Sequence, residues 1–403
     1  MERAQIKAYG VFVGIDVGKA SNYVVAIEGD DEEPFVSREV PQEEALRQVL
    51  AEASARGSAI VVVDQCGTIG RLPVAVAKDM GLFAAHIPPR KFDQVAETYG
   101  EDKDDLIDAY IIADAARSNP RLVDPVGERA EAVARIKVLA SARDDCVAER
   151  TRCYNRLHDL VNQACPPLEA VFAKQRLRNE LEIRLLERYG GPQGFRSAGE
   201  EQCSEWAGSL KYQPNRGPER VAQVFEALAL QTVELPAADV IEQQVKRLAK
   251  RVIDLNAEEE ALSSQIGELA AAVPEVGILR TIPGVGRVCG AVIAAEIGDV
   301  SRFKDSAHLA TYAGLSPVRR QSSASVNKKR KRKGGNRRLK NAFMQSADSA
   351  RHHEPWAREY YDRKRREGRK HKQALLALAR RRVDVVYAML SNGTCYEPRT
   401  KEA

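Results

Sequence analysis

The sequence of 403 residues lacks several features that would assign it to a familiar class. Its seven cysteines are scattered and form no Cys-x-x-Cys pair, which argues against a zinc ribbon and against a disulfide framework. No apolar run approaches the roughly 18 residues that predict a transmembrane helix. The odd number of cysteines and the lack of a secretory signal fit a reducing compartment, so we expect a cytoplasmic protein without a membrane partner.

A large net charge is also missing, because 62 basic residues face 57 acidic ones and leave a net charge of +5. The charges are nevertheless unevenly distributed. Basic residues gather between Lys328 and Lys340 and between Arg358 and Lys372, whereas acidic residues gather between Glu28 and Glu33 and between Glu97 and Asp108. This separation predicts an acidic catalytic half and a basic half that faces phosphate groups.

Short apolar runs alternate with amphipathic patterns over the first 120 residues or so. The expected strands are 11–15, 23–27, 35–40, 60–63 and 82–87. The expected helices are 42–55, 71–80 and 105–117. Strands mixed with helices in this way predict an α/β domain.

The middle of the chain has a heptad pattern instead. Its main series consists of Ile241, Leu248, Leu255, Leu262 and Leu269, and a second series of Val245, Val252 and Ile266 is interrupted only at Glu259. A weaker series lies upstream at Leu139, Cys146, Cys153 and Leu160. We therefore predict two long helices with a coiled-coil seam over about four heptads. The Gly- and Pro-containing segment near 190–218 is expected to be an irregular insertion between them.

The segment from Leu279 to Val300 resembles a helix-hairpin-helix element. Gly284 and Gly286 form its tight turn, whose backbone N–H groups would face a DNA phosphate. The chain after it is expected to be basic and helical, with a frayed tail after Asn392. We therefore divide the chain into an acidic domain (1–125), a coiled-coil region (126–275), a C-terminal domain (276–392) and a tail (393–403).

Four carboxylates are candidate metal ligands. Asp16 and Asp64 each end an expected strand, and Asp105 and Asp108 share one face of an expected helix. If they converge, they offer the hard oxygen ligands that Mg²⁺ prefers and that two-metal phosphoryl chemistry requires. Each acid taken alone is equally well explained as an ordinary turn or helix-cap residue.

A serine is the second candidate. Ser322 follows a Gly-Leu-x-Pro turn and precedes the basic run, so its hydroxyl could attack a phosphodiester held there. Ser323 is the neighbouring candidate, and a solvated loop is the alternative interpretation. The residues expected to bind nucleic acid are Gly284, Gly286, Lys328, Lys329, Arg330, Lys331, Arg332, Lys333, Arg337, Arg338 and Lys340.

These motifs together resemble the transposases of the insertion sequence one-ten family. The resemblance covers most of the chain and is strongest at VGIDVGK, at KDDLIDA, and from IPGVG through AGLSP to GGNRRLK. It implies a RuvC-like, RNase H-fold α/β domain with a DEDD acidic tetrad, followed by helices and a mostly α-helical C-terminal domain with a serine. Asp16, Asp64, Asp105 and Asp108 match the tetrad, and Ser322 matches the serine.

The resemblance also implies a mechanism and partners. The serine would attack DNA and form a phosphoserine intermediate with the help of Mg²⁺ at the acidic residues, and a bridge RNA would pair with donor and target DNA. Homodimers would assemble into tetramers, for which the coiled-coil seam offers a physical reason. Three departures stand out: Asp64 replaces the usual Glu, Lys103-Asp104-Asp105 replaces Lys-Thr-Asp, and Ser323 replaces the Gly after the serine.

Two other functions remain open from the sequence. The protein could be a RuvC-like nuclease that hydrolyses branched DNA with metal ions and no serine. It could also be a non-catalytic nucleic-acid scaffold, in which case Asp16→Asn would change nothing. The placement of Asp16 and Asp64 at strand ends argues against the scaffold.

Overall fold

The computed structural model describes residues 6, 8–29, 31–64, 70–99, 104–173, 180–210, 216–316, 318–321, 327–330 and 334–398. Its contacts divide the chain into two compact units. One unit combines Met1–Arg135 with Leu269–Ala403, and the other is Ile136–Glu268. None of the helices in the described ranges is long and apolar enough to cross a membrane.

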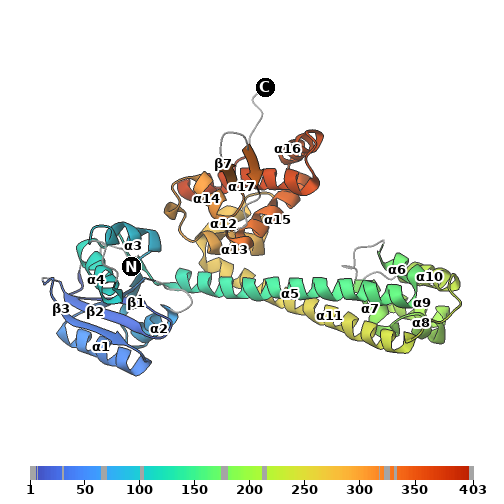
Figure 1. Ribbon diagram of the computed structural model, residues 1–403, viewed down its shortest axis with the longest axis horizontal. Helices are drawn as coiled ribbons and strands as arrows, with labels where there is room; N and C mark the ends of the chain where they lie inside the picture. Colours follow the sequence, from blue (N-terminus) through green and yellow to red (C-terminus); the bar gives the residue numbers. More distant parts are fainter. Residues whose placement is uncertain are drawn as a thin grey trace. The chain divides into compact units, whose positions relative to one another are not determined.

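The amino-terminal part of the first unit contains a mixed sheet of six strands, drawn in blue in Figure 1. Its strands are β1 (Val11–Val17), β2 (Asn22–Glu28), β3 (Pro34–Val40), β4 (Ala59–Val63), β5 (Phe83–His86) and β6 (Asp124–Pro125). They are arranged in the order β3-β2-β1-β4-β5-β6. β1, β4 and β5 are parallel to one another, and β2, β3 and β6 pair antiparallel with their neighbours. The α/β arrangement expected from the sequence is confirmed.

Alternating side chains of the strands build two separate cores. Val11, Val13 and Ile15 pack on one face with α1 (Glu43–Arg56) and α2 (Arg71–Asp79). Phe12 faces the opposite side and packs with α4 (Asp105–Ser118), whose Ala109, Ile112 and Ala113 are fully buried. The short helix α3 (Pro89–Ala96) contributes Phe92 and Val95 to this second core.

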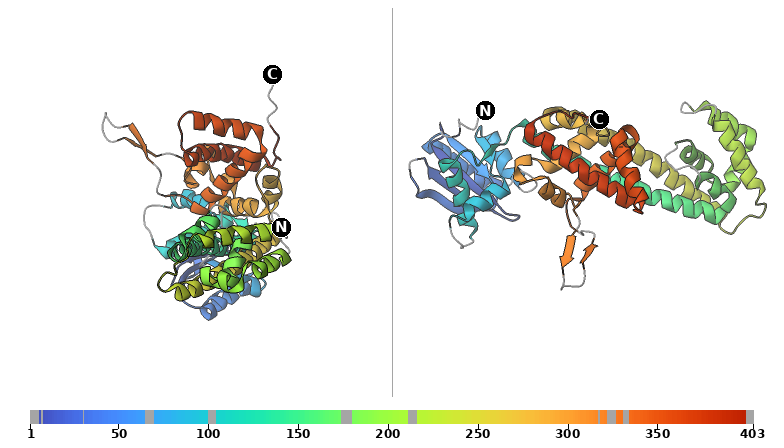
Figure 2. Two further views of the ribbon diagram at one scale, coloured as in Figure 1. Left: turned by 90° about the vertical axis from the view of Figure 1, so that its right-hand side faces the viewer. Right: turned by 90° about the horizontal axis from the view of Figure 1, so that it is seen from above.

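The second unit is helical. Its two long helices, α5 (Glu128–Ala164) and α11 (Ala238–Leu269), run side by side in Figure 1 and in the right view of Figure 2. Both heptad series contribute to their contact, because Val252 and Leu255 of α11 share one core with Cys153 of α5. Glu259, which interrupts the second series, pairs with Arg143 and Arg150 of α5. The central part of the seam therefore packs α11 against α5 of the same chain, whereas Ile241 and Leu262 are only partly buried. A role of the seam in dimer formation stays a prediction.

The expectation of an irregular insertion near 190–218 is wrong for its described residues. They form α8 (Pro192–Ala198), α9 (Glu200–Ser209) and the beginning of α10 (Arg216–Ala229), and α6 (Pro166–Ala173) and α7 (Glu180–Tyr189) lie next to them along the chain. Some of its glycines and prolines mark helix ends: Pro192 starts α8, and Gly199, with φ of 78°, separates α8 from α9.

The carboxy-terminal part of the first unit is mostly helical, as expected. Its helices are α12 (Pro274–Arg280), α13 (Arg287–Ile297), α14 (Ser306–Tyr312), α15 (Arg337–His353), α16 (Pro355–Arg366) and α17 (His371–Asn392). A strand pair, β7 (Val318–Gln321) and β8 (Asn327–Arg330), interrupts them.

The prediction that the tail frays after Asn392 is wrong as far as Tyr396. The backbone N–H of Tyr396 donates to the Thr281 hydroxyl at 2.8 Å, and the Tyr396 hydroxyl accepts from the Trp356 indole at 3.2 Å. An aromatic side chain with both packing and hydrogen-bonding partners anchors this end of the chain.

Candidate active site

Two parallel strands bring Asp16 and Asp64 to one edge of the sheet. Asp16 lies in β1, and Asp64 follows the last residue of β4. Ile15 pairs with Val63, and the Asp64 amide donates to the Ile15 carbonyl at 3.4 Å, which continues the register by one residue. The two carboxylates are therefore neighbours across the strands, as the sequence predicts.

The alternation of side chains directs both acids toward α4. In β1, Asp16 has the parity of Phe12, and in β4, Asp64 has the parity of Ile60 and Val62. Phe12, Ile60 and Val62 all belong to the core beneath α4. The two acids extend the α4 side of the sheet beyond its apolar part.

Gly14 brings the third and fourth acids close. A β-carbon at Gly14 would lie 2.1 Å from the Ala109 carbonyl oxygen, so the missing side chain lets α4 rest directly on β1. Asp105 and Asp108 occupy the first turn of α4, immediately before Ala109. Asp104 caps that turn by accepting from the Leu106 amide at 3.1 Å. The helix thus presents Asp105 and Asp108 at the end of β1 that carries Asp16.

The electrostatics of Asp16 show that the four carboxylates interact. Burial, followed by the charges of Asp64, Asp108 and Asp105, raises the pKa of Asp16 to about 6. The Val17 amide acts in the opposite direction on Asp16, and it also donates to Asp64 Oδ1 at 3.2 Å. Four like charges that are held together in this way favour either a proton or a cation between them.

The residues fit a hard divalent cation by their chemistry, since all four are carboxylates. Within the described ranges, however, no three His, Cys, Asp or Glu side chains are already arranged around one point as metal ligands. The four aspartates form an electrostatic cluster whose side chains would have to close further around an ion.

Tyr23 is a neighbour of this cluster that the sequence analysis missed. It pairs with Asp16 across β1 and β2. The charge of Glu39 raises the pKa of the Tyr23 hydroxyl most, and Asp105 raises it further through its charge and a hydrogen bond. Tyr23 was counted only as part of an apolar strand, and the antiparallel register of β1 and β2 is the signal that places it beside Asp16.

The serine candidates cannot be placed in the same way. Ser322, Ser323, Lys331, Arg332 and Lys333 lie outside the described residues. The backbone on either side is described: β7 and β8 pair antiparallel, with Gln321 opposite Asn327. Ser322 therefore comes directly after a hairpin strand, and Lys328, Lys329 and Arg330 belong to the returning strand.

The base of this hairpin is closed by a polar cluster. Asn336 donates through its side chain to Glu296 at 2.6 Å and to the Tyr312 hydroxyl at 3.2 Å, and its Oδ1 caps α15. A β-carbon at Gly335, where φ is 117°, would lie 2.8 Å from the Gly314 backbone. The AGLSP and GGN motifs are therefore pressed together where the hairpin leaves and rejoins the helices.

Two of the predicted phosphate-binding residues contribute to this closure. Arg338 pairs with Glu296 at 2.8 Å, and the Lys340 ammonium donates to the Gly314 carbonyl at 2.9 Å. Arg337 is exposed. Contact of these residues with nucleic acid stays a prediction.

The predicted Gly-rich turn lies between α12 and α13. Gly284 has φ of 83°, and a β-carbon there would lie 2.9 Å from backbone atoms of Ser346 and Ala350 in α15. Gly286 precedes the first residue of α13, and a β-carbon there would meet no atom within 4 Å. Gly284 thus has a packing role, whereas Gly286 has open space around it; DNA binding by the turn stays a prediction.

Comparison with known proteins finds a family match at each end of the chain. Residues 13–166 match a family model described as a transposase, and residues 276–362 match one described as the transposase IS116/IS110/IS902 family. The chain is 37% identical to an insertion element IS110 protein of Streptomyces coelicolor over 97% of this chain and 96% of the relative. It is 34% identical to an IS116 protein of Streptomyces clavuligerus over 96% of each chain. A pilin gene-inverting protein of Moraxella bovis is 31% identical over 35% of this chain and 46% of the relative.

Proposed function

Because the chain belongs to the IS116/IS110/IS902 family of transposases and is therefore a DNA-recombining enzyme, we propose that it cuts and rejoins DNA through a serine nucleophile with a divalent metal site. The observation that carries the metal site is the effect of Asp64, Asp108 and Asp105 on the pKa of Asp16 at one edge of the sheet. A sheet with three antiparallel strands followed by parallel β4 and β5, with the first acid in β1, supports an RNase H-like, RuvC-like domain.

The proposed metal ligands are Asp16, Asp64, Asp105 and Asp108, and the proposed ion is Mg²⁺, in a two-metal arrangement. A bound Mg²⁺ pair would neutralise charge on the phosphate oxygens during cleavage. The chain itself provides four interacting carboxylates, the Val17 amide that holds Asp64, and Tyr23 beside Asp105. The Asp64 side chain is one methylene shorter than the Glu that is usual at this position in the family. The hydrogen bond from its backbone amide to the Ile15 carbonyl holds Asp64 beside Asp16.

Ser322 is the proposed nucleophile. Its Oγ forms a bond to the phosphorus of one DNA strand, the phosphorus bond to one sugar oxygen breaks, and that oxygen leaves as a hydroxyl with the proton lost by the serine. Because the phosphodiester is exchanged for a phosphoserine ester and no water is consumed, the reverse step can join a different strand. The closed base formed by Gly314, Gly335 and Asn336 would hold strands β7 and β8, which precede and follow this serine in the chain.

A trapped covalent intermediate tests this proposal. The wild-type protein should form a DNA adduct on a peptide containing Ser322, and Ser322→Ala should abolish both the adduct and recombination in cells. Ser323→Ala is the matched control and should keep both. Cleavage without an adduct would instead support a RuvC-like nuclease that hydrolyses DNA, and recombination by Ser322→Ala would rule out Ser322 as the nucleophile.

We propose that donor and target DNA bind the basic C-terminal part, and that a bridge RNA guides the enzyme. The relative from Moraxella bovis is named a pilin gene-inverting protein, which supports DNA as the substrate. Purification of the protein with its co-expressed nucleic acid should recover one discrete RNA encoded beside its gene. Random cellular RNA alone would argue against a guide.

Assembly into dimers and tetramers is part of the same proposal. Since most of the heptad seam packs α11 against α5 of one chain, contacts between subunits would use the partly buried ends of the seam or other surfaces. Light scattering of the protein with its nucleic acid should show two or four copies; a single copy during strand exchange would contradict it.

A further inference from the structure

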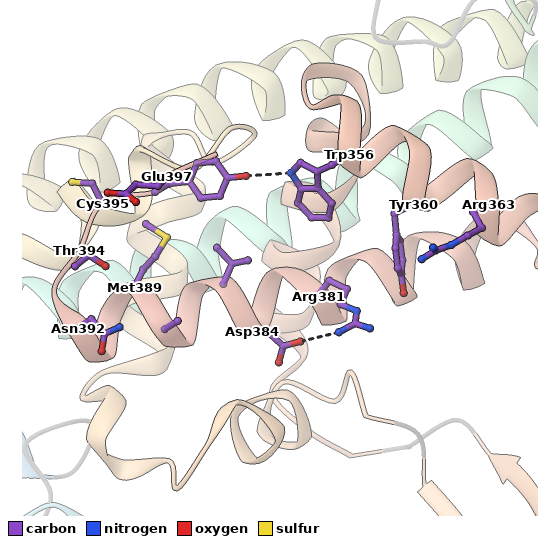
Figure 3. A pocket seen from close by; sticks show the side chains of 13 residues that line it. Trp356, Tyr360, Arg363, Arg381, Asp384, Met389, Asn392, Thr394, Cys395 and Glu397 are labelled. Carbon is purple, nitrogen blue, oxygen red and sulfur yellow. Dashed lines mark hydrogen bonds and ion pairs between the residues drawn. The ribbon is translucent and has the colours of Figure 1, made fainter. Parts of the chain in front are cut away.

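Helices α16 and α17 and the tail line an open cavity of about 630 Å³ that the proposed chemistry does not use (Figure 3). Trp356 and Tyr360 line it from α16, Met389 from α17, and Tyr396 from the tail. Trp356 and Tyr360 are four residues apart and therefore lie on the same face of their helix. The cavity thus has planar aromatic rings and an apolar side, which is the chemistry of a site for a flat ring.

Cationic groups lie among these rings. The Arg363 guanidinium is 5.0 Å from the centre of the Tyr360 ring, and Arg381 also lines the cavity. The last turn of α16 is basic throughout, with Arg363, Lys364, Arg365 and Arg366. A polyanionic strand passing this turn would be attracted to the mouth of the cavity.

Two acids line the cavity, and the charge of one of them, Asp384, is offset by its neighbours. Asp384 pairs with Arg380 and with Arg381, the latter at 4.0 Å, and accepts a hydrogen bond from the Ser306 hydroxyl at 2.6 Å. Its charge is therefore offset inside the protein, which reduces its repulsion of a phosphate. Glu397 is the other acid of the lining and lies on the exposed tail.

We propose that this cavity binds one unpaired nucleobase of a nucleic-acid strand, stacked on Tyr360 and Trp356, with Arg363 contacting the phosphate of the strand. The inference rests on the proposed function, because it assumes that a nucleic acid passes the basic C-terminal part. Aromatic stacking combined with a basic surface is how proteins hold unpaired bases without reading their sequence. The strand can be DNA or RNA, since both offer the same aromatic face.

Tryptophan fluorescence tests the inference directly, because the chain has two tryptophans. Trp206 lies in the other unit, 5.6 Å from Tyr189 between ring centres, so Trp206→Phe leaves Trp356 as the reporter. A 12-nucleotide single strand should quench its emission, and the same strand with abasic sites should not. The matched Trp356→Phe protein, which keeps Trp206, should show no quenching.

A second variant keeps the test valid if Trp206→Phe does not fold. Tyr360→Ala should weaken single-strand affinity roughly 5- to 150-fold, the equivalent of about 1–3 kcal/mol per stacked base. Tyr360→Phe should retain the affinity. Tyr361→Ala removes a ring from the next position on the same helix that does not line the cavity, and it should also bind as the wild type does.

Titrations with a DNA strand and with an RNA strand of the same sequence show which nucleic acid supplies the base. Tighter binding of either strand supports the inference. The absence of quenching by both strands, or equal affinity for the abasic strand, overturns it. If neither strand quenches Trp356 while the Ser322 adduct still forms, the inference about the cavity is wrong and the proposed function stands. If no adduct forms while the strand still quenches Trp356, the proposed function fails and the base site stands.

Discussion

Gly14 of β1 lies directly against Ala109 of α4, and the next turn of the helix is equally close, since a β-carbon at Gly14 would lie 2.5 Å from the Ala113 amide nitrogen. Gly14→Ala must therefore push α4 away from the strand. We expect a loss of about 1–3 kcal/mol in the free energy of unfolding from overpacking, and a pKa of Asp16 closer to normal as Asp105 and Asp108 move away. Urea unfolding measures the first effect.

The matched control is Gly127→Ala, because a β-carbon at Gly127 meets no atom within 4 Å. It should stay within about 0.5 kcal/mol of the wild type. Equal stability of the two variants would mean that the close approach of α4 does not position the acids.

The raised pKa of Asp16 predicts how stability depends on pH. Between pH 3.8 and about pH 6, Asp16 keeps its proton in the folded state and loses it in the unfolded state. The free energy of unfolding therefore falls as the pH rises through this range. Asp16→Asn should therefore melt at a higher temperature than the wild type at pH 7 without divalent ions, and the difference should shrink toward pH 4.

Asp93→Asn, an exposed change on α3, is the control and should leave the melting temperature unchanged. Added Mg²⁺ should stabilise the wild type more than Asp16→Asn, because an ion replaces the missing proton. A lower melting temperature of Asp16→Asn at pH 7 would argue against crowded charges at the site.

The sequence predicts this cluster for a physical reason. Strand-end acids and an i, i+3 pair follow from two-residue and 3.6-residue periodicities, which are local properties of the chain. Tyr23 could not be found in this way, because its place beside Asp16 depends on the register of β1 and β2. The heptad series of α11 and its weaker partner upstream in α5 were both recognised from their seven-residue spacing, and they share one core.

The misjudged segments share another cause. Gly190 to Pro218 was expected to be irregular because of its glycines and prolines, yet short helices start and end at just such residues. The tail was expected to fray because it is terminal, but Tyr396 finds Trp356 and Thr281, residues that are distant in sequence. Composition cannot predict such contacts.

A buried ion pair holds the Gly-rich turn. Arg382 and Glu354 pair at 2.9 Å with side chains 2% and 6% exposed, and Arg382 also donates to Ser346 Oγ and the Pro283 carbonyl. Arg382→Met should destabilise the protein by about 3–5 kcal/mol, because it leaves the Glu354 charge buried without its partner. Adding Glu354→Leu should recover much of this loss in chemical unfolding. A double variant as unstable as the sum of both single changes would contradict this explanation.

The base of the serine hairpin can be tested through Asn336. Asn336→Ala should cost about 1–2 kcal/mol of stability through the lost cap of α15, and it should also release Glu296 and Tyr312 from the closure. Asn336→Ser keeps a capping hydroxyl without the amide. If the closure positions the hairpin, both variants should lose recombination in cells, although Asn336→Ser unfolds close to the wild type. Full activity of Asn336→Ser would restrict Asn336 to helix capping.

The most direct test of the acidic site is calorimetric titration of Mg²⁺ or Mn²⁺ into the wild type and into Asp16→Asn, Asp64→Asn, Asp105→Asn and Asp108→Asn. We predict that each of the four changes weakens binding or removes a bound ion, whereas Asp93→Asn binds as the wild type does. Unchanged binding in any of the four would remove that residue from the site, and unchanged binding in all of them would contradict a shared metal centre.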